Sequence, residues 1–309
     1  MSDSHDLKPQ KKGEEYGASR PSQAQYFRNP PRHADRLEDS AMHAPLRFRL
    51  VALDQLTIDD RPAFTAVAIY GRLEGILRRS GHRFRIPEGG QTVSWDRALF
   101  LNLTYWNEDD GADVLCDDHI PADVVAHVGW HEVVRRQLAG RRSSPSAPPS
   151  AAALFLAESI ASAFDLYLVG RLVPRAPDCD FVTTQVPLMA QCAAEAGLPE
   201  AGFSALLEEV VREPERAFED LRALLFDAAT ALLACSGVAE AQAALEQLAD
   251  RRFAPLLHHY QLSNWILYAR AYTQPPVADA ATVEVDRALR QAPVSLDWLD
   301  CHFIEAAAK

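Results

Sequence analysis

The stretch SAAALFLAESIASAFDLYLVGRL, residues 150–172, decides the fold, because its composition predicts a long helix that is apolar on most of its surface. Such a helix belongs in the interior of a protein, where other elements cover it on all sides. An acidic residue, Glu158, stands in its middle. Burying an unpaired charge is expensive, so we expect Glu158 to have a specific partner.

A second helix is predicted upstream, opened by Pro121, and it contains VVAHVGWHEVVRRQL at residues 124–138. Residues four apart on a helix lie about 40° apart around its axis, because each residue turns about 100°. His127 and His131 can therefore direct their imidazoles at one point. Two histidines need a third ligand to hold a metal ion, and Glu158 is the best candidate.

This arrangement resembles the gluzincin group of zinc metallopeptidases, in which one helix bears H-E-x-x-H and a second supplies a glutamate ligand within E-x-x-x-D. Here the two motifs stand as HVGWH (127–131) and ESIAS (158–162), and the resemblance covers about residues 95–172. It implies a zincin-like scaffold that holds one divalent metal ion on His127, His131 and Glu158. Zinc is the first expectation for that ion and iron the second.

Two positions depart from the gluzincin pattern. Val128 stands in place of the glutamate that acts as general base, and Ser162 stands in place of an aspartate that orients a histidine. Ser162 still offers a hydrogen bond, and Asp165 is close enough in sequence to orient a histidine in altered form. Valine moves no proton, and general acid–base catalysis typically supplies about 10²–10⁴-fold in rate. Ordinary peptide hydrolysis is therefore not expected.

Glu132 and His259 are the candidates to assist the metal ion. Glu132 lies about 6 Å further along the helix than Val128, at about 1.5 Å per residue. A metal-linked role and a solvated carboxylate paired with Arg135 or Arg136 are equally good interpretations of it. His259 or its neighbour His258 would act as an electrophile or as an extra ligand, with Tyr260 or Tyr268 as alternatives.

The whole chain predicts an α+β protein, with a small sheet and the metal-binding helices followed by a mainly helical C-terminal lobe. Residues 1–40 are polar and predict a disordered leader. Residues 41–173 predict an α/β region that includes a flexible linker at 141–150. Residues 174–309 predict the helical lobe, because apolar residues recur there at three-and-four spacing.

Local patterns in the α/β region predict strands and one helix. Residues 46–53, LRFRLVAL, predict a half-buried strand with Phe48 and Leu50 on the buried face. A helix is expected to begin after Asp59 or Asp60, since either can cap it, with Pro62 in its first turn, and to continue to about residue 80. Residues 82–86 and 97–106 predict further strands.

Composition excludes several classes of protein. The 43 acidic and 31 basic residues give a net charge of −12, which disfavours binding to nucleic acid because phosphate contacts need clustered Lys and Arg. The N-terminus has no signal-peptide pattern, and no run is expected to reach the roughly 20 apolar residues of a membrane span. A cytoplasmic location is the expectation. Five scattered cysteines predict reduced thiols and no disulfide framework.

Three classes of function remain open at this point. The first is a metalloenzyme of non-peptidase type, either a hydrolase or a non-haem iron oxidoreductase, since two histidines and a carboxylate also hold Fe(II). The second is an inactive pseudo-peptidase that binds metal and a peptide or protein partner. The third is a metal-free helical interaction protein. In the first two, a small molecule or peptide would bind in a cleft between the lobes.

Overall fold

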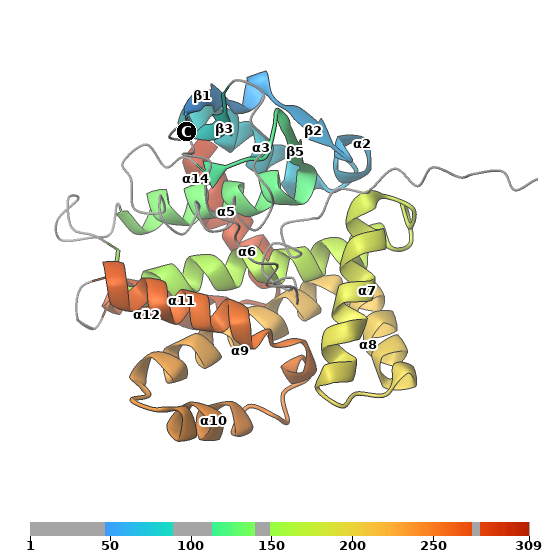
Figure 1. Ribbon diagram of the computed structural model, residues 1–309, viewed down its shortest axis with the longest axis vertical. Coiled ribbons are helices and arrows are strands. Elements are labelled where there is room, and N and C mark those ends of the chain that lie inside the picture. The colour runs from blue at the N-terminus through green and yellow to red at the C-terminus, as the bar shows by residue number, and fades with distance from the viewer. Residues whose placement is uncertain (1–46, 89–112, 140–148, 274–278, 309) are drawn as a thin grey trace, which may run out of the picture.

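A computed structural model describes residues 47–88, 113–139, 149–273 and 279–308 (Figure 1). The fold is mostly helical with a few short strands, which is compatible with the predicted α+β class. The predicted leader, the strand at 97–106 and nearly all of the linker at 141–150 lie outside the described residues. The strands are β1 (Phe48–Ala52), β2 (Thr57–Asp59), β3 (Arg83–Pro87), β4 (Asp113–Val114) and β5 (His119–Pro121).

The helices of the first half are α2 (Arg61–Phe64), α3 (Ala68–Ser80), α5 (Ala122–Ala139) and α6 (Ala151–Leu172). The second half contains α7 (Asp180–Glu195), α8 (Glu200–Arg212), α9 (Pro214–Ala234), α10 (Val238–Glu246), α11 (His259–Tyr272) and α12 (Ala280–Gln291). The chain ends in α13 (Ser295–Leu299), a π-helical turn (Asp300–Ile304) and α14 (Glu305–Ala308). The predicted helical C-terminal half is confirmed.

The strands form two small sheets. In the first the order is β1-β3-β4, with β1 antiparallel and β4 parallel to β3, and in the second β2 runs parallel to β5. The predicted buried face of β1 is wrong by one residue, since Val51 is buried and Leu50 is 47% exposed. Val51 lies opposite the fully buried Phe84, and both belong to the hydrophobic core, so their face of the sheet is the one that packs inward.

The helix predicted after Asp60 is interrupted. α2 begins at Arg61 with Pro62 in its first turn, as expected, but it ends at Phe64, and α3 begins only at Ala68. Asp60 adopts a left-handed conformation (φ 57°) and its side chain does not cap α2. Instead its carboxylate accepts a hydrogen bond from the backbone N–H of Phe181, at the start of α7. The contact with α7 has therefore replaced the helix cap that Asp60 could have provided.

Helix α6 is the core of the molecule, as residues 150–172 predicted. It packs against α5 on one side and α9 on another (Figure 1). With 22 residues it is long and apolar enough to cross a membrane, which corrects the expectation that no run approaches that length; 83% of its most apolar window is buried inside the fold. Ser150 caps its N-terminus by accepting a hydrogen bond from the N–H of Ala153.

Two glycines allow the helices around α6 to approach closely. A Cβ at Gly170 would lie 2.6 Å from the carbonyl oxygen of Val210 and 2.8 Å from Cβ of Pro214, so α6 meets α8 and α9 there without a side chain between them. A Cβ at Gly129, on α5, would lie 3.1 Å from Cβ of Leu73 on α3. These contacts bring α6 close to α8 and α9, and α5 close to α3.

One hydrophobic core joins the two halves of the chain. Its buried residues run from Val51 to Ile304 without separating into two clusters. The last helices return to the N-terminal half, where the segment after residue 300 contacts α3 and α5 (Figure 1). In the helical half, the fully buried Arg222 is paired with Glu219 and with Asp286. All five cysteines are free thiols, as predicted.

Candidate metal centre

The motif HVGWH is placed by the packing of α5 between α3 and α6. Gly129 turns toward Leu73 of α3, and a residue two positions away on a helix points to nearly the opposite side. His127 and His131 therefore both face α6, where Glu158 stands. Gly129, in the middle of the motif, allows α5 to pack closely against α3, while His127 and His131 point toward Glu158 on α6.

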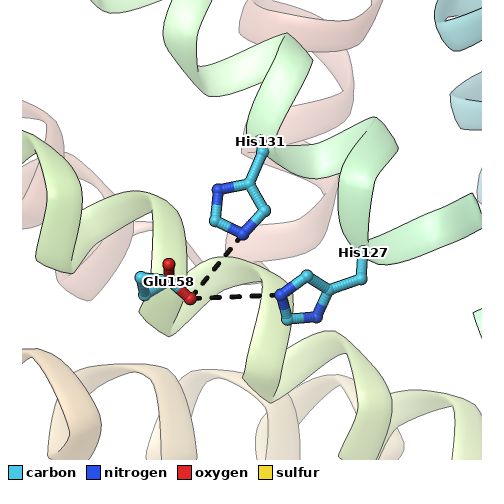
Figure 2. A group of neighbouring side chains, drawn as sticks. All are labelled: His127, His131 and Glu158. Atoms are coloured by element: carbon cyan, nitrogen blue, oxygen red, sulfur yellow. Dashed lines mark ion pairs between the residues drawn. The ribbon is translucent and has the colours of Figure 1, made fainter. Parts of the chain in front are cut away.

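The three predicted ligands are brought together. Nε2 of His127 lies 4.0 Å and Nε2 of His131 lies 3.6 Å from Oε2 of Glu158. One donor atom from each residue lies within 4.8 Å of the other two. Figure 2 shows both imidazoles, which come from α5, directed at the same carboxylate oxygen of Glu158 on α6.

This arrangement fits a metal ion in its chemistry and nearly in its spacing. Zinc binds nitrogen at about 2.0–2.1 Å, which in a tetrahedral site sets donor atoms about 3.4 Å apart. The two separations to Glu158, 3.6 and 4.0 Å, are close to this value, whereas the cluster as a whole spans up to 4.8 Å, so the side chains would have to move together to hold an ion. Among the described residues, Nδ1 of His127 and Oε1 of Glu158 are buried without a hydrogen-bond partner. Buried polar atoms normally have partners. Oε1 of Glu158 belongs to the carboxylate that both imidazoles face, so this carboxylate can bind a further group, whereas Nδ1 of His127 lies on the side of the ring that faces Asp165.

Burial sets the charge of the cluster. Removal from water lowers the pKa of His127 to about 4 and, together with the neighbouring His127, lowers that of His131 to about 3. Burial also raises the pKa of Glu158 to about 8, with the charge of Asp113 acting in the same direction. Without a metal ion at pH 7 the histidines are therefore neutral and hold free lone pairs, while Glu158 is mostly protonated.

A polar stripe on α6 begins at Glu158 and continues with Ser162, four residues further on, and Asp165, three residues after that. Oδ2 of Asp165 lies 3.7 Å from Nδ1 of His127, the ring nitrogen that faces away from Glu158. A small movement would make this contact a hydrogen bond, which would hold His127 with Nε2 free for a metal ion. Ser162 accepts a hydrogen bond from Nε2 of Gln261 and so ties α6 to α11.

Glu132 is engaged elsewhere. It is buried on α5, and its two oxygens accept hydrogen bonds from Arg135 and Arg136, which confirms the ion pair that was one of its two interpretations. It is not solvated, because the arginines cover it. Val128 is buried as well. The side chain of His259 lies outside the described residues. His258 caps the N-terminus of α11 by accepting a hydrogen bond from the N–H of Gln261.

A pair that the sequence did not single out influences the charge of the centre. His82 and Asp113 are hydrogen-bonded at 3.0 Å, and the charge of Asp113 acts on the pKa of all three candidate ligands. Their separation of 31 residues, with no motif around either one, gave no signal in the sequence.

Comparisons with known proteins find no relative: no family model matches the chain, and neither a curated protein nor a solved structure is similar to it. Any function must therefore be inferred from this chain's own residues.

Proposed function

We propose that this protein is a metal-dependent enzyme of non-peptidase type, with one divalent ion held by His127, His131 and Glu158. The observation that carries the proposal is the convergence of three donor atoms within 4.8 Å of one another, from two helices in the core. Polar groups placed in a core helix reduce stability unless something compensates them. A metal ion would provide that compensation.

Zinc is the proposed ion, with iron second. Neutral imidazole nitrogens and a carboxylate suit both metals, and the described residues offer no thiolate near the cluster that would select a softer one. Structural zinc sites usually have four protein ligands, whereas catalytic sites have three and leave a position for water or substrate. Three ligands in the described part of the chain favour the catalytic type over a purely structural ion.

A zincin-like arrangement is part of this proposal. The order of strand β5, helix α5 with two histidines and helix α6 with the glutamate supports it. Val128 still argues against peptide hydrolysis, because the base that would activate water and protonate the leaving amine is missing from α5. The substrate we propose is a small molecule or a peptide held between the two halves of the chain, in a reaction other than general proteolysis.

Metal analysis of protein purified without a histidine tag tests the proposal. We expect about one equivalent of zinc, or of iron, in the wild type and a large loss in His131→Ala. The matched control is His119→Ala, because His119 is also paired with a carboxylate, Asp59, at 2.8 Å, but is not part of the cluster. Wild-type protein that takes up neither metal from a buffered solution would end the proposal.

A further inference from the structure

Helix α11 contacts the polar stripe of α6 that begins at Glu158. It packs against both α6 and α9. Its first turn is tied to α6, because Nε2 of Gln261 donates a hydrogen bond of 3.0 Å to Oγ of Ser162. Ser162 follows Glu158 by one helical turn, which is about 6 Å along α6 at about 1.5 Å per residue. This hydrogen bond therefore places α11 beside the face of α6 that bears the candidate ligand.

The course of α11 leads from this hydrogen bond toward the N-terminus of α6. Ser150, at the start of α6, donates a hydrogen bond to Asp279, the N-cap of α12. The chain from Tyr272, the end of α11, to Asp279 spans at most about 25 Å. If α11 ran parallel to α6 from Gln261, its end would lie about 35 Å from Ser150, at about 1.5 Å per residue. A parallel course is thus out of reach.

Asn264 is the buried polar residue on this part of α11. It follows Gln261 by three residues, so it lies about 4.5 Å further toward the level of Glu158 and about 60° around the helix axis. Asn264 is only 7% exposed, and its Nδ2 has no hydrogen-bond partner among the described residues. The same holds for Oε1 of Glu158. Buried polar atoms normally have partners, and a bound polar molecule can supply them.

The polar stripe of α6 and the ligands next to it are open to solvent in part. The side chain of His131 is 29% exposed, against 5% for Glu158. Asp165, whose Oδ2 lies 3.7 Å from Nδ1 of His127, has a side chain that is 27% exposed. A small molecule can therefore reach the cluster without first passing through the apolar core.

We propose that Asn264 binds the substrate of the metal centre by donating a hydrogen bond from Nδ2 to a substrate oxygen, and that this substrate is a small carboxylate. The inference rests on the proposed function above. Nδ2 is a donor and selects a group that accepts. A carboxylate has two such oxygens, one for the metal ion and one for Asn264. A site that hydrogen-bonds its substrate in this way discriminates strongly against analogues that lack the acceptor.

The first test measures how close Asn264 lies to the ion, by NMR of the full-length protein with Co²⁺ in place of zinc. The unpaired electrons of Co²⁺ shift and broaden the signals of nearby groups, so the side-chain amide signals of Asn264 should differ clearly from those in zinc-loaded protein. The side-chain amide of Gln242, which donates to Glu246 on α10, should be unaffected. Unchanged Asn264 signals in protein that has bound cobalt would overturn the inference, and this test needs no variant.

The second test measures the affinity of cobalt-loaded protein for acetate, from the visible absorption of the bound ion. Asn264→Leu keeps the size of the side chain but removes the donor, and it should bind acetate about threefold to tenfold more weakly at equal cobalt content. N-Methylimidazole is the matched ligand, because it binds the ion through nitrogen and has no oxygen for Asn264; its affinity should not fall. Gln242→Leu is the matched variant and should bind acetate as the wild type does.

The outcomes separate this inference from the function on which it rests. Wild-type acetate affinity in Asn264→Leu would overturn the role of Asn264. An equal loss for both ligands, or a loss of cobalt, would also overturn it, by showing that Asn264 supports the centre instead of binding the substrate. Cobalt-loaded wild type that does not bind acetate would remove the substrate class and leave the metal centre standing, whereas a wild type that binds no metal would remove the centre itself.

A second variant keeps the inference testable if Asn264→Leu does not fold. Asn264→Asp preserves the shape of the side chain but replaces the donor with a negative charge. It should weaken acetate binding further than the loss of the hydrogen bond alone, because two carboxylates repel each other. Undiminished acetate binding by Asn264→Asp at equal cobalt content would overturn the inference.

Discussion

Glu158→Gln should abolish the pH dependence of zinc affinity. In the wild type a metal ion must displace the proton that Glu158 carries up to a pKa of about 8, whereas the histidines, with pKa values of about 4 and 3, are already deprotonated above pH 6. Competition by that one proton predicts that affinity rises about 50-fold between pH 6 and pH 8 and levels off above that range. Glutamine has no proton to displace, so zinc binding by this variant should be weaker and nearly independent of pH.

The assay is competition with a chromogenic chelator across that pH range, with the chelator's own protonation taken into account. Glu132→Gln is the matched control, because it removes another buried carboxylate from the neighbouring helix and should retain the wild-type slope. A slope that persists in Glu158→Gln would mean that Glu158 is not the titrating ligand. A slope approaching three protons below pH 6.5 would mean that the histidines ionise normally and that burial does not lower their pKa values.

The same carboxyl group also affects the stability of the metal-free protein. Because its pKa is raised on folding, from 4.5 to about 8, its contribution is fully present below pH 4.5 and is lost as the pH rises through 8. The histidines have the opposite dependence, since their lowered pKa values reduce stability as the pH falls below about 6.5. Urea denaturation should therefore show Glu158→Gln losing less stability than the wild type between pH 6 and pH 8.5.

Three further changes follow from the packing and the site. Asp165→Asn should lower zinc affinity about 10–100-fold by releasing His127, whereas Ser162→Ala should change it little; equal losses in chelator competition would contradict this. Gly170→Ala should destabilise the fold by about 1–3 kcal/mol through steric clash, whereas Gly71→Ala, on an exposed turn of α3 with open space around it, should stabilise it by about 0.5–1 kcal/mol, as measured by urea unfolding. Zinc-loaded wild type should leave casein uncut, and Val128→Glu should introduce weak peptide hydrolysis; robust cleavage by the wild type would reveal a base that the proposal lacks.

Local patterns of residue type and spacing in the sequence determined the helices that carry the candidate ligands. Residues 150–172 are apolar on most of the helix surface, which predicts a helix covered on all sides, and α6 has nearly those bounds. The spacing of His127 and His131 is enough to predict their common direction, because helix geometry alone aligns residues four apart. Glu158 could be chosen because a carboxylate in such a helix needs a partner.

Only the tertiary structure decided the details that depend on contacts between distant segments. Packing against the core buried Val51, together with its partner Phe84, instead of Leu50. The N–H of Phe181 took the carboxylate of Asp60, one of the two residues expected to cap the helix. The pairing of His82 with Asp113 likewise required β3 and β4 to lie side by side. The sequence by itself thus determined the helices and the direction of the ligands, because these follow from local periodicity. What surrounds the ligands was decided by tertiary packing, which brings together residues that no local pattern relates.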